Sequence, residues 1–308
     1  MNWDKGRYDG DSTVDQRFWQ IIQDFSKINK SSKKQKVCFV GFPSDDGVKY
    51  NLGRVGSALA PDVIRNKMLS MPKVERIKLF DAGNVEKKEN SLSSHQLIYA
   101  KIISNIISKN SLAIGLGGGH EIAYGTFNGV KKALKKNTKI GIINFDAHLD
   151  MRPYDKGTSS GTMFKQIADE NEEFHYLPIG IQTTGNTQRL FSIAKEHNIS
   201  IITFEDTINK VLEELQESIV NFIDKVDAVY LTFCMDVFDI SDAPGVSAPC
   251  AIGIDKRLVL QLIQTICSSK KIVAVDFAEV NPSLDIDERT SRLVAYLIHY
   301  IINLISIK

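Results

Sequence analysis

Two aspartates and a histidine at alternate positions form the first group in this sequence that could do chemistry. Asp146, His148 and Asp150 end the stretch 139–150, which reads KIGIINFDAHLD and begins as a buried strand. Because alternate residues of an extended chain share one face, both carboxylates and the imidazole would project in the same direction. At the mouth of an apolar strand, three such groups would repel one another or lack partners unless a cation satisfied them. The pattern favours a divalent metal site over a polar strand end that meets solvent.

Candidate partners for this site follow three other strand-like runs. Three glycines in the loop GGGHE permit a close backbone approach just before His120. Cys234 and Asp236 share a strand face by the same alternation. Glu279 follows a very apolar run, where a carboxylate could accept paired N–H donors from a planar amidinium. The alternatives are a hydrogen-bonded loop histidine, a turn or helix-capping aspartate and a structural ion pair, respectively.

The elements that must position these residues alternate between strands and helices. Strand-like runs occur at 36–42, 75–80, 111–116, 139–146, 174–181, 199–204, 226–235 and 271–278. Helical patterns occur between them, for example at 95–108, 121–135, 187–197, 207–223, 255–268 and 288–305. This alternation predicts a parallel sheet of about eight strands covered on both faces. Ligands of such sheets bind beyond the carboxyl ends of the strands, so the candidate residues are expected to converge there.

The chain is expected to form a single large unit. Residues 36–308 carry the strand and helix pattern without a visible linker or repeat, and residues 1–35 are polar apart from one amphipathic piece at 18–28. We therefore predict a single catalytic domain at 36–308 with an N-terminal arm, 1–35, packed on it.

Composition excludes several classes of function. The 308 residues carry a net charge of +1, which gives no electrostatic argument for binding nucleic acid or an anionic membrane. Four separated cysteines without a CxxC motif predict reduced thiols. No apolar run resembles a signal peptide or a membrane span, so we expect a cytoplasmic protein that acts on a small molecule.

Oxygen and imidazole ligands suit Mn²⁺, and shared carboxylates suit a pair of ions. Two divalent ions about 3.5–4 Å apart can hold and deprotonate a bridging water at neutral pH. The resulting hydroxide would attack a planar carbon while Glu279 held the positive nitrogens of the substrate.

Five segments, in order along the chain, resemble the ureohydrolase family of arginase and agmatinase. They are GRVGSALAPDVIR (53–65), GGGHE (117–121), NFDAHLD (144–150), DVFD with APGVSAP (236–249) and AEVNP (278–282). The resemblance implies a three-layer α/β/α sandwich with an eight-stranded, mostly parallel sheet, two Mn²⁺ per subunit and a homo-oligomer, trimer or hexamer. It implies that His120 and Asp150 bind one ion, that His148 and Asp236 bind the other, and that Asp146 bridges them.

Within this family the chain looks most like the formimidoylglutamases, because of DAHLDMRP, SSGTMF (159–164), GIQTTGNTQ (180–188) and the CMDVFD segment. The implied reaction belongs to histidine degradation and hydrolyses N-formimidoyl-L-glutamate to L-glutamate and formamide, with Asp146 and Glu279 as catalytic residues. The two carboxylates of that substrate need cationic or amide partners. Arg152 is the first candidate, followed by Asn186 and Arg54, and Arg54 has a purely structural role as its alternative.

Two departures from the family pattern leave alternatives open. Cys234 stands where the family has a bridging aspartate, so it either bridges two ions, is a bystander, or marks a site with a single metal. A thiolate would also favour Zn²⁺ over Mn²⁺. The loop 159–166 lacks the histidine that arginase-like members use to shuttle protons. An agmatinase- or arginase-type guanidino hydrolase and a catalytically silent relative are therefore the competing hypotheses.

Overall fold

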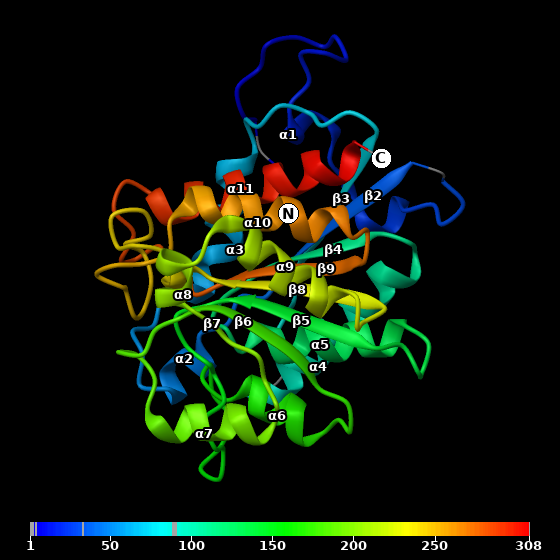
Figure 1. Cartoon of the computed structure of the whole chain (residues 1–308). Coiled ribbons are helices and arrows are strands. Elements are labelled where there is room, and N and C mark those ends of the chain that lie inside the picture. The colour runs from blue at the N-terminus through cyan, green and yellow to red at the C-terminus, as the bar shows by residue number, and fades with distance from the viewer. Residues whose placement is uncertain (1–2, 4, 33, 88–90, 308) are drawn as a thin grey trace.

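A single parallel sheet with helices on both faces makes up the fold (Figure 1). The computed structural model describes residues 3, 5–32, 34–87 and 91–307. The strands are β1 (Gln23–Asp24), β2 (Gln35–Gly41), β3 (Ile77–Asn84), β4 (Leu112–Leu116), β5 (Ile140–Phe145), β6 (His175–Ile181), β7 (Ile202–Thr203), β8 (Ala228–Cys234) and β9 (Ile272–Ala278). They pair in the order β1-β3-β2-β4-β9-β8-β5-β6-β7, and every pair of neighbours is parallel.

Helices fill the connections between the strands. The α-helices are α1 (Phe18–Ile21), α2 (Asp46–Tyr50), α3 (Ala60–Met68), α4 (Leu92–Ser108), α5 (Ile122–Ala133), α6 (Met163–Asp169), α7 (Gln188–Glu196), α8 (Phe204–Asn209), α9 (Leu212–Ile223), α10 (Lys256–Ser268) and α11 (Arg289–Ser306). Three short 3-10 helices are η1 (Phe25–Lys27), η2 (Ser57–Leu59) and η3 (Met235–Val237). The predicted α/β/α class is confirmed.

The sheet has one strand more than the eight that the sequence predicts. All eight expected strands are present, and the ninth is β1, two exposed residues of the N-terminal arm that pair with Phe80 and Asp81 of β3. A strand of two polar residues is too short to show a hydrophobic period in the sequence. It can be recognised only from its pairing with β3. The arm also contributes the fully buried Phe18 to the main core. The boundary between an arm and a catalytic domain near residue 35 stays a prediction.

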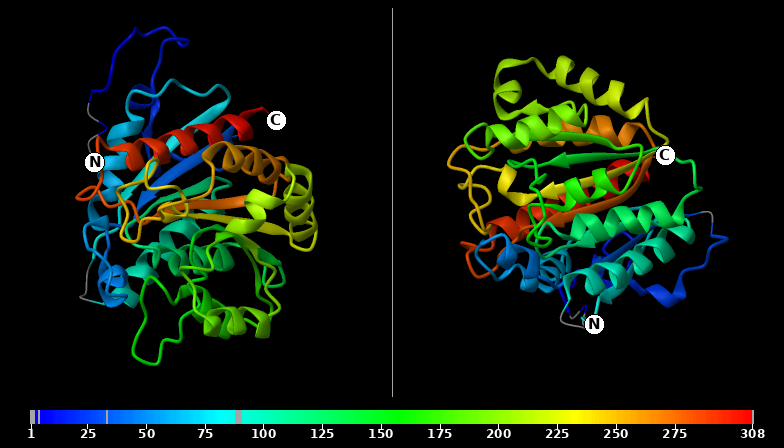
Figure 2. Two further views of the ribbon diagram at one scale, coloured as in Figure 1. Left: turned by 60° about the vertical axis from the view of Figure 1, so that its left-hand side comes forward. Right: turned by 90° about the horizontal axis from the view of Figure 1, so that it is seen from below.

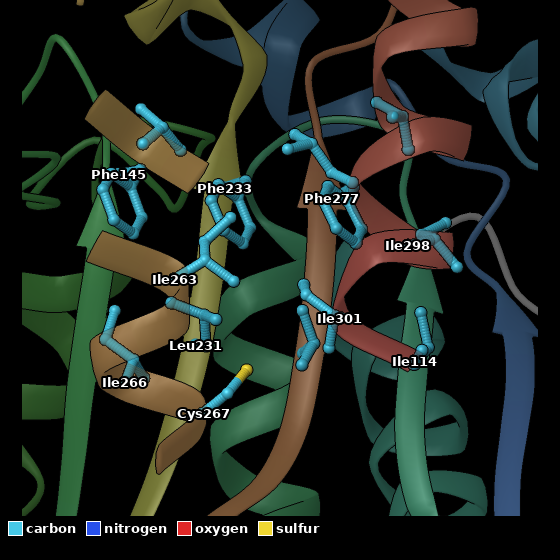
Figure 3. Close-up of a cluster of buried hydrophobic side chains, with 14 of the residues drawn as sticks. Ile114, Phe145, Leu231, Phe233, Ile263, Ile266, Cys267, Phe277, Ile298 and Ile301 are labelled. Carbon is cyan, nitrogen blue, oxygen red and sulfur yellow. The ribbon is translucent and has the colours of Figure 1, made fainter. Parts of the chain in front are cut away.

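Helices lie on both faces of the sheet (Figures 1 and 2). Each face has its own hydrophobic core. Helices α3, α9, α10 and α11 cover one face, and α4, α5, α6 and α7 cover the other. On the first face, Phe145, Phe233 and Phe277 stack across three adjacent strands, with ring centroids 4.9 Å apart in both pairs (Figure 3). Stacked aromatic rings stabilise a fold by more than their buried area alone would give. These three residues are also opposite one another in the register of β5, β8 and β9.

The helix predicted at 207–223 is wrong in its bounds, because the chain forms two helices there. A capping box between Thr203 and Asp206 starts α8 earlier than the apolar period indicates. Lys210 and Val211 then adopt extended backbone before α9 begins. No helix in the described part of the chain has the length and apolar character that crossing a membrane requires.

Candidate metal centre

The candidate metal ligands and Glu279 lie at or just after the carboxyl ends of four adjacent central strands, β4, β9, β8 and β5. Their carboxyl ends point the same way, and the loops that follow them surround a cavity of about 440 Å³. The candidate residues that line it are His120, His148, Asp150, Cys234, Asp236, Glu279, Arg54, Arg152 and Asn186. Asp146 is completely buried beneath them.

Asp146 lies between two histidines and offers one carboxylate oxygen to each. Its Oδ2 is 3.0 Å from His120 Nδ1, and its Oδ1 is 3.7 Å from His148 Nδ1. On the first side Asp150 Oδ2 is 3.1 Å from His120 Nδ1, and on the second side Asp236 Oδ2 is 3.2 Å from His148 Nδ1. The described residues thus contain two ligand groups with one shared carboxylate, which is the arrangement that a bridged pair of ions needs.

The electrostatics of these five residues fit divalent cations. Burial opposes ionisation of Asp146, yet the two histidines hold its pKa well below the ordinary value. Burial opposes the charged form of His120 and His148 as well, but the neighbouring carboxylates raise the pKa of both imidazoles well above the ordinary value. Burial and the charge of Asp146 raise the pKa of Asp150 to about 6. Asp236 Oδ1 is buried and has no hydrogen-bond partner within the described residues. A cation would satisfy these groups, so the residues present fit a two-ion site.

The aspartates and His148 converge through loops and not through the shared strand face that the sequence suggests. Strand β5 ends at Phe145, and the backbone turns immediately after it. Asp146 Oδ1 accepts a hydrogen bond from the backbone N–H of His148, at 2.8 Å, and Asp150 has a left-handed backbone with φ of 49°. The alternation argument was therefore wrong in its geometry, although the side chains that it grouped do lie together.

Cys234 is buried as the last residue of β8, with its sulfur in the ligand group of His120 and Asp146. Burial and the surrounding carboxylates raise the pKa of its thiol well above the ordinary value. A nearby cation would reverse that preference, because it stabilises the thiolate. Its place among the ligands fits either a bridging sulfur or a neighbouring one, and its role stays a prediction.

The other nitrogen of His120 faces a buried polar network that the sequence analysis missed. Nε2 lies 3.0 Å from Thr232 Oγ1. Thr232 stands opposite Asp276 across the β8–β9 pair, and Asp276 Oδ2 accepts hydrogen bonds from Tyr230 and Thr126. With Nδ1 directed at the candidate ion, the imidazole would donate Nε2–H to Thr232. An aspartate inside the apolar run IVAVDFA was the sequence signal for this network.

Glu279 lines the cavity from the end of β9 in a left-handed conformation, with φ of 66°. Its Oε1 accepts a hydrogen bond from the backbone N–H of His120 at 2.9 Å. Burial, together with the charge of Glu121, raises its pKa to about 8. The strained backbone and the buried, high-pKa carboxylate are typical of a functional position.

Glu121 was not singled out from the sequence, although it is fully buried next to His120. Its carboxylate accepts hydrogen bonds from Gly47 N–H and from the Ser44 hydroxyl. Burial raises its pKa to about 7. A Cβ atom at Gly47 would lie 2.5 Å from this carboxylate, and one at Gly118 would lie 1.7 Å from the Ser44 carbonyl oxygen. The glycines therefore permit the close approach of residues 44–47, which directly precede Val48 in the lining of the cavity.

The three predicted substrate-binding residues differ in how many of their hydrogen-bond donors are already used within the protein. Arg152 is exposed at the cavity wall. Arg54 donates from Nε to the carbonyl of Ser247 and from Nη2 to that of Val246. Asn186 donates both amide hydrogens to backbone carbonyls of the surrounding loops. Arg152 therefore has the most capacity to bind a ligand, and the substrate-binding roles of all three stay predictions.

Comparison with known proteins identifies the family. Residues 35–303 match the sequence model of the arginase family. This chain belongs to the arginase family. The resemblance to the ureohydrolases is thereby confirmed.

Two relatives of this arginase-family chain are similar over nearly their whole length. One is named formimidoylglutamase, from Fusobacterium nucleatum, and is 40% identical over 98% of this chain and 97% of its own length. Another, from Lysinibacillus sphaericus, carries the same name and is 37% identical over 97% of this chain and 94% of its own length.

Solved structures agree with the fold. The formimidoylglutamase of Bacillus subtilis superposes with a TM-score of 0.86 over 99% of this chain and 96% of its own, at 23% identity. A Trypanosoma cruzi formiminoglutamase solved with Mn²⁺ superposes with a TM-score of 0.80 over 90% of this chain and 96% of its own, at 21% identity.

Proposed function

We propose that this chain is a metal-dependent formimidoylglutamase, which hydrolyses N-formimidoyl-L-glutamate to L-glutamate and formamide with two Mn²⁺ ions per subunit. The observation that carries the proposal is the pair of ligand groups that share Asp146 at the carboxyl end of the sheet. The substrate assignment is supported by relatives that are 36–40% identical and carry that name.

In this proposal His120 and Asp150 would hold one ion, His148 and Asp236 would hold the other, and Asp146 would serve both. A bound pair of divalent ions supplies an activated water at neutral pH. The water oxygen forms a bond to the formimidoyl carbon, the bond from that carbon to the glutamate nitrogen breaks, and the amine leaves with a proton.

Glu279 is the proposed partner of the amidinium group. Its Oε1 is already fixed by the backbone N–H of His120, so the carboxylate has a set orientation before substrate arrives. A planar amidinium presents two N–H donors, which a carboxylate accepts with its two oxygens. The positive charge of the substrate would favour the ionised form of Glu279 and so lower its raised pKa.

Arg152 is the proposed partner of one substrate carboxylate. It follows the metal-ligand segment directly and is exposed at the wall of the cavity. A guanidinium group binds a carboxylate through two parallel hydrogen bonds, which would fix the direction of the amino acid relative to Glu279.

The test is product release from a panel of substrates. Protein loaded with Mn²⁺ is expected to release formamide from N-formimidoyl-L-glutamate and little urea from L-arginine or agmatine. Formamide is measured by proton NMR, and the metal content of the same preparation is measured by elemental analysis. Urea release without formamide would refute the substrate assignment, and protein that binds no divalent ion would refute the metal centre.

We also propose a cytoplasmic homo-oligomer, trimer or hexamer. Free thiols at Cys38, Cys234 and Cys250 support a reducing compartment. Sedimentation equilibrium would give the subunit number, and cell fractionation would give the compartment.

A further inference from the structure

A second cavity, of about 340 Å³, borders the metal cavity on its outer side. It is lined by Arg152, Pro153, Asp155, Lys156, Thr187, Arg189 and Leu190. Arg152 and Leu190 also line the metal cavity, so the two cavities meet at these side chains. A ligand held at the metal centre can therefore extend past Arg152 into the second cavity.

Unpaired positive charge distinguishes this second cavity. The side chains of Arg152, Lys156 and Arg189 make no hydrogen bond or ion pair within the described part of the chain. Asp155 supplies the single carboxylate of the lining. Elsewhere, Arg65 is paired with Asp81 at 2.7 Å. The cavity therefore presents free cations where an anionic group could bind.

The proposed substrate carries two carboxylates, and of the guanidinium groups that line the metal cavity only that of Arg152 has all its donors free within the described residues. N-formimidoyl-L-glutamate carries an α-carboxylate close to the amidine and a γ-carboxylate at the far end of its side chain. Arg54 already gives two of its five N–H donors to backbone carbonyls, and Asn186 gives both of its amide hydrogens. Arg152 can bind the α-carboxylate at the junction. The γ-carboxylate then needs a further cation, and the second cavity contains two.

Arg189 is better placed than Lys156 to hold that carboxylate in a fixed position. It lies in the first turn of α7, directly before Leu190, which is buried between the two cavities. Leu190, Ile193 and Ala194 anchor this helix in the second core. Lys156 lies in the loop after the metal-ligand segment, and its flexible side chain can add charge without fixing direction.

We propose that Arg189, assisted by Lys156, binds the γ-carboxylate of the substrate in the second cavity and makes the enzyme selective for amidines that carry two carboxylates. This inference rests on the proposed function. The chemistry it requires is a charge-assisted hydrogen bond between a guanidinium and a carboxylate, outside the metal centre and away from the bond that breaks.

The test compares N-formimidoyl-L-glutamate with N-formimidoyl-L-glutamine, which has nearly the same size and lacks the γ charge. Wild-type enzyme should prefer the glutamate derivative in kcat/KM by at least about tenfold. Arg189→Gln should reduce that preference to near one, mainly through KM, and Arg189→Lys should retain part of it. Lys195→Gln removes one charge from an exposed position in the last turn of α7 and is the matched control.

Binding of the product gives a second measurement that is independent of turnover. L-glutamate should inhibit the wild-type enzyme more strongly than L-glutamine does, and Arg189→Gln should remove the difference. If Arg189→Gln kept both the substrate preference and the inhibition ratio of the wild type, the second cavity would not be the carboxylate site. Wild-type enzyme that hydrolyses neither amidine would overturn the proposed function itself.

Discussion

Replacing Thr232 by valine would test whether the buried network behind His120 sets the affinity for metal. The change replaces one hydroxyl by a methyl group and keeps the β-branched shape of the side chain. His120 would lose the partner that lies 3.0 Å from Nε2, and its side chain is only 1% exposed. In the metal-bound form the imidazole would then carry an unsatisfied buried N–H.

The size of the effect follows from that lost partner. A buried donor without an acceptor costs about 1–3 kcal/mol. At a pH high enough to deprotonate His120 in the metal-free protein, the remaining proton can lie on Nδ1 beside Asp146, whereas an ion on Nδ1 forces it onto Nε2. In a titration at such a pH the cost therefore falls on the metal-bound state. An energy of this size corresponds to a loss of about 5- to 150-fold in affinity for Mn²⁺, in the range typical of residues that orient metal ligands.

The assay is a Mn²⁺ titration of the metal-free protein, with free ion measured by electron paramagnetic resonance. Thr232→Ser should restore most of the affinity because it restores the hydroxyl. Thr126→Val is the matched control, since its hydroxyl bonds to Asp276 and makes no hydrogen bond to His120 within the described residues. Both valine variants should lose stability, and only Thr232→Val should lose metal. Equal affinity in Thr232→Val and wild type would refute the reasoning.

Four further predictions follow from the site. Asp146→Asn should reduce both bound metal and formamide release to background, because one carboxylate serves both ligand groups; elemental analysis and the formamide assay check this together. Glu279→Gln should keep its metal and lose about 10- to 100-fold in kcat/KM, since the charged half of the amidinium contact is gone; unchanged kinetics would remove Glu279 from the reaction. In the metal-free protein, the pKa of Glu279 is raised to about 8 by burial, so the folded state holds a proton that the unfolded state releases near pH 4.5. Stability should therefore fall from about pH 5 to 8, less steeply in Glu279→Gln, as measured by urea denaturation. Cys234→Asp should raise the preference for Mn²⁺ over Zn²⁺ in competition binding, because it replaces a soft ligand by a hard one; an unchanged preference would make Cys234 a bystander.

The sequence predicted which residues gather at the site better than it predicted how they do so. Strand and helix periods located all eight main strands, and the rule that ligands bind at their carboxyl ends brought His120 and Asp236 into one cavity. The backbone conformation of the site could not be predicted from the sequence, because Asp150 and Glu279 adopt left-handed conformations that only the surrounding loops determine. Side-chain periodicity assumes regular backbone, so it fails at the turns where chemistry is concentrated.

Side-chain contacts between neighbouring strands could not be predicted from the sequence either. Thr232 and Asp276 are 44 residues apart and become neighbours only through the register of β8 on β9. The second cavity likewise depends on how the loop that carries Lys156 meets the start of α7. Contacts of this kind come from tertiary packing, which local patterns do not encode.

Both outermost strands of the sheet, β1 and β7, are only two residues long. An unpaired edge strand can form backbone hydrogen bonds with a strand of another polypeptide. Such pairing is a common route to aggregation and fibril formation. Here the row of free backbone groups is too brief at either side to template such growth. β1 pairs with Phe80 and Asp81 of the longer strand β3. Deleting the residues that form β1 would therefore expose these two backbone positions to pairing with another chain.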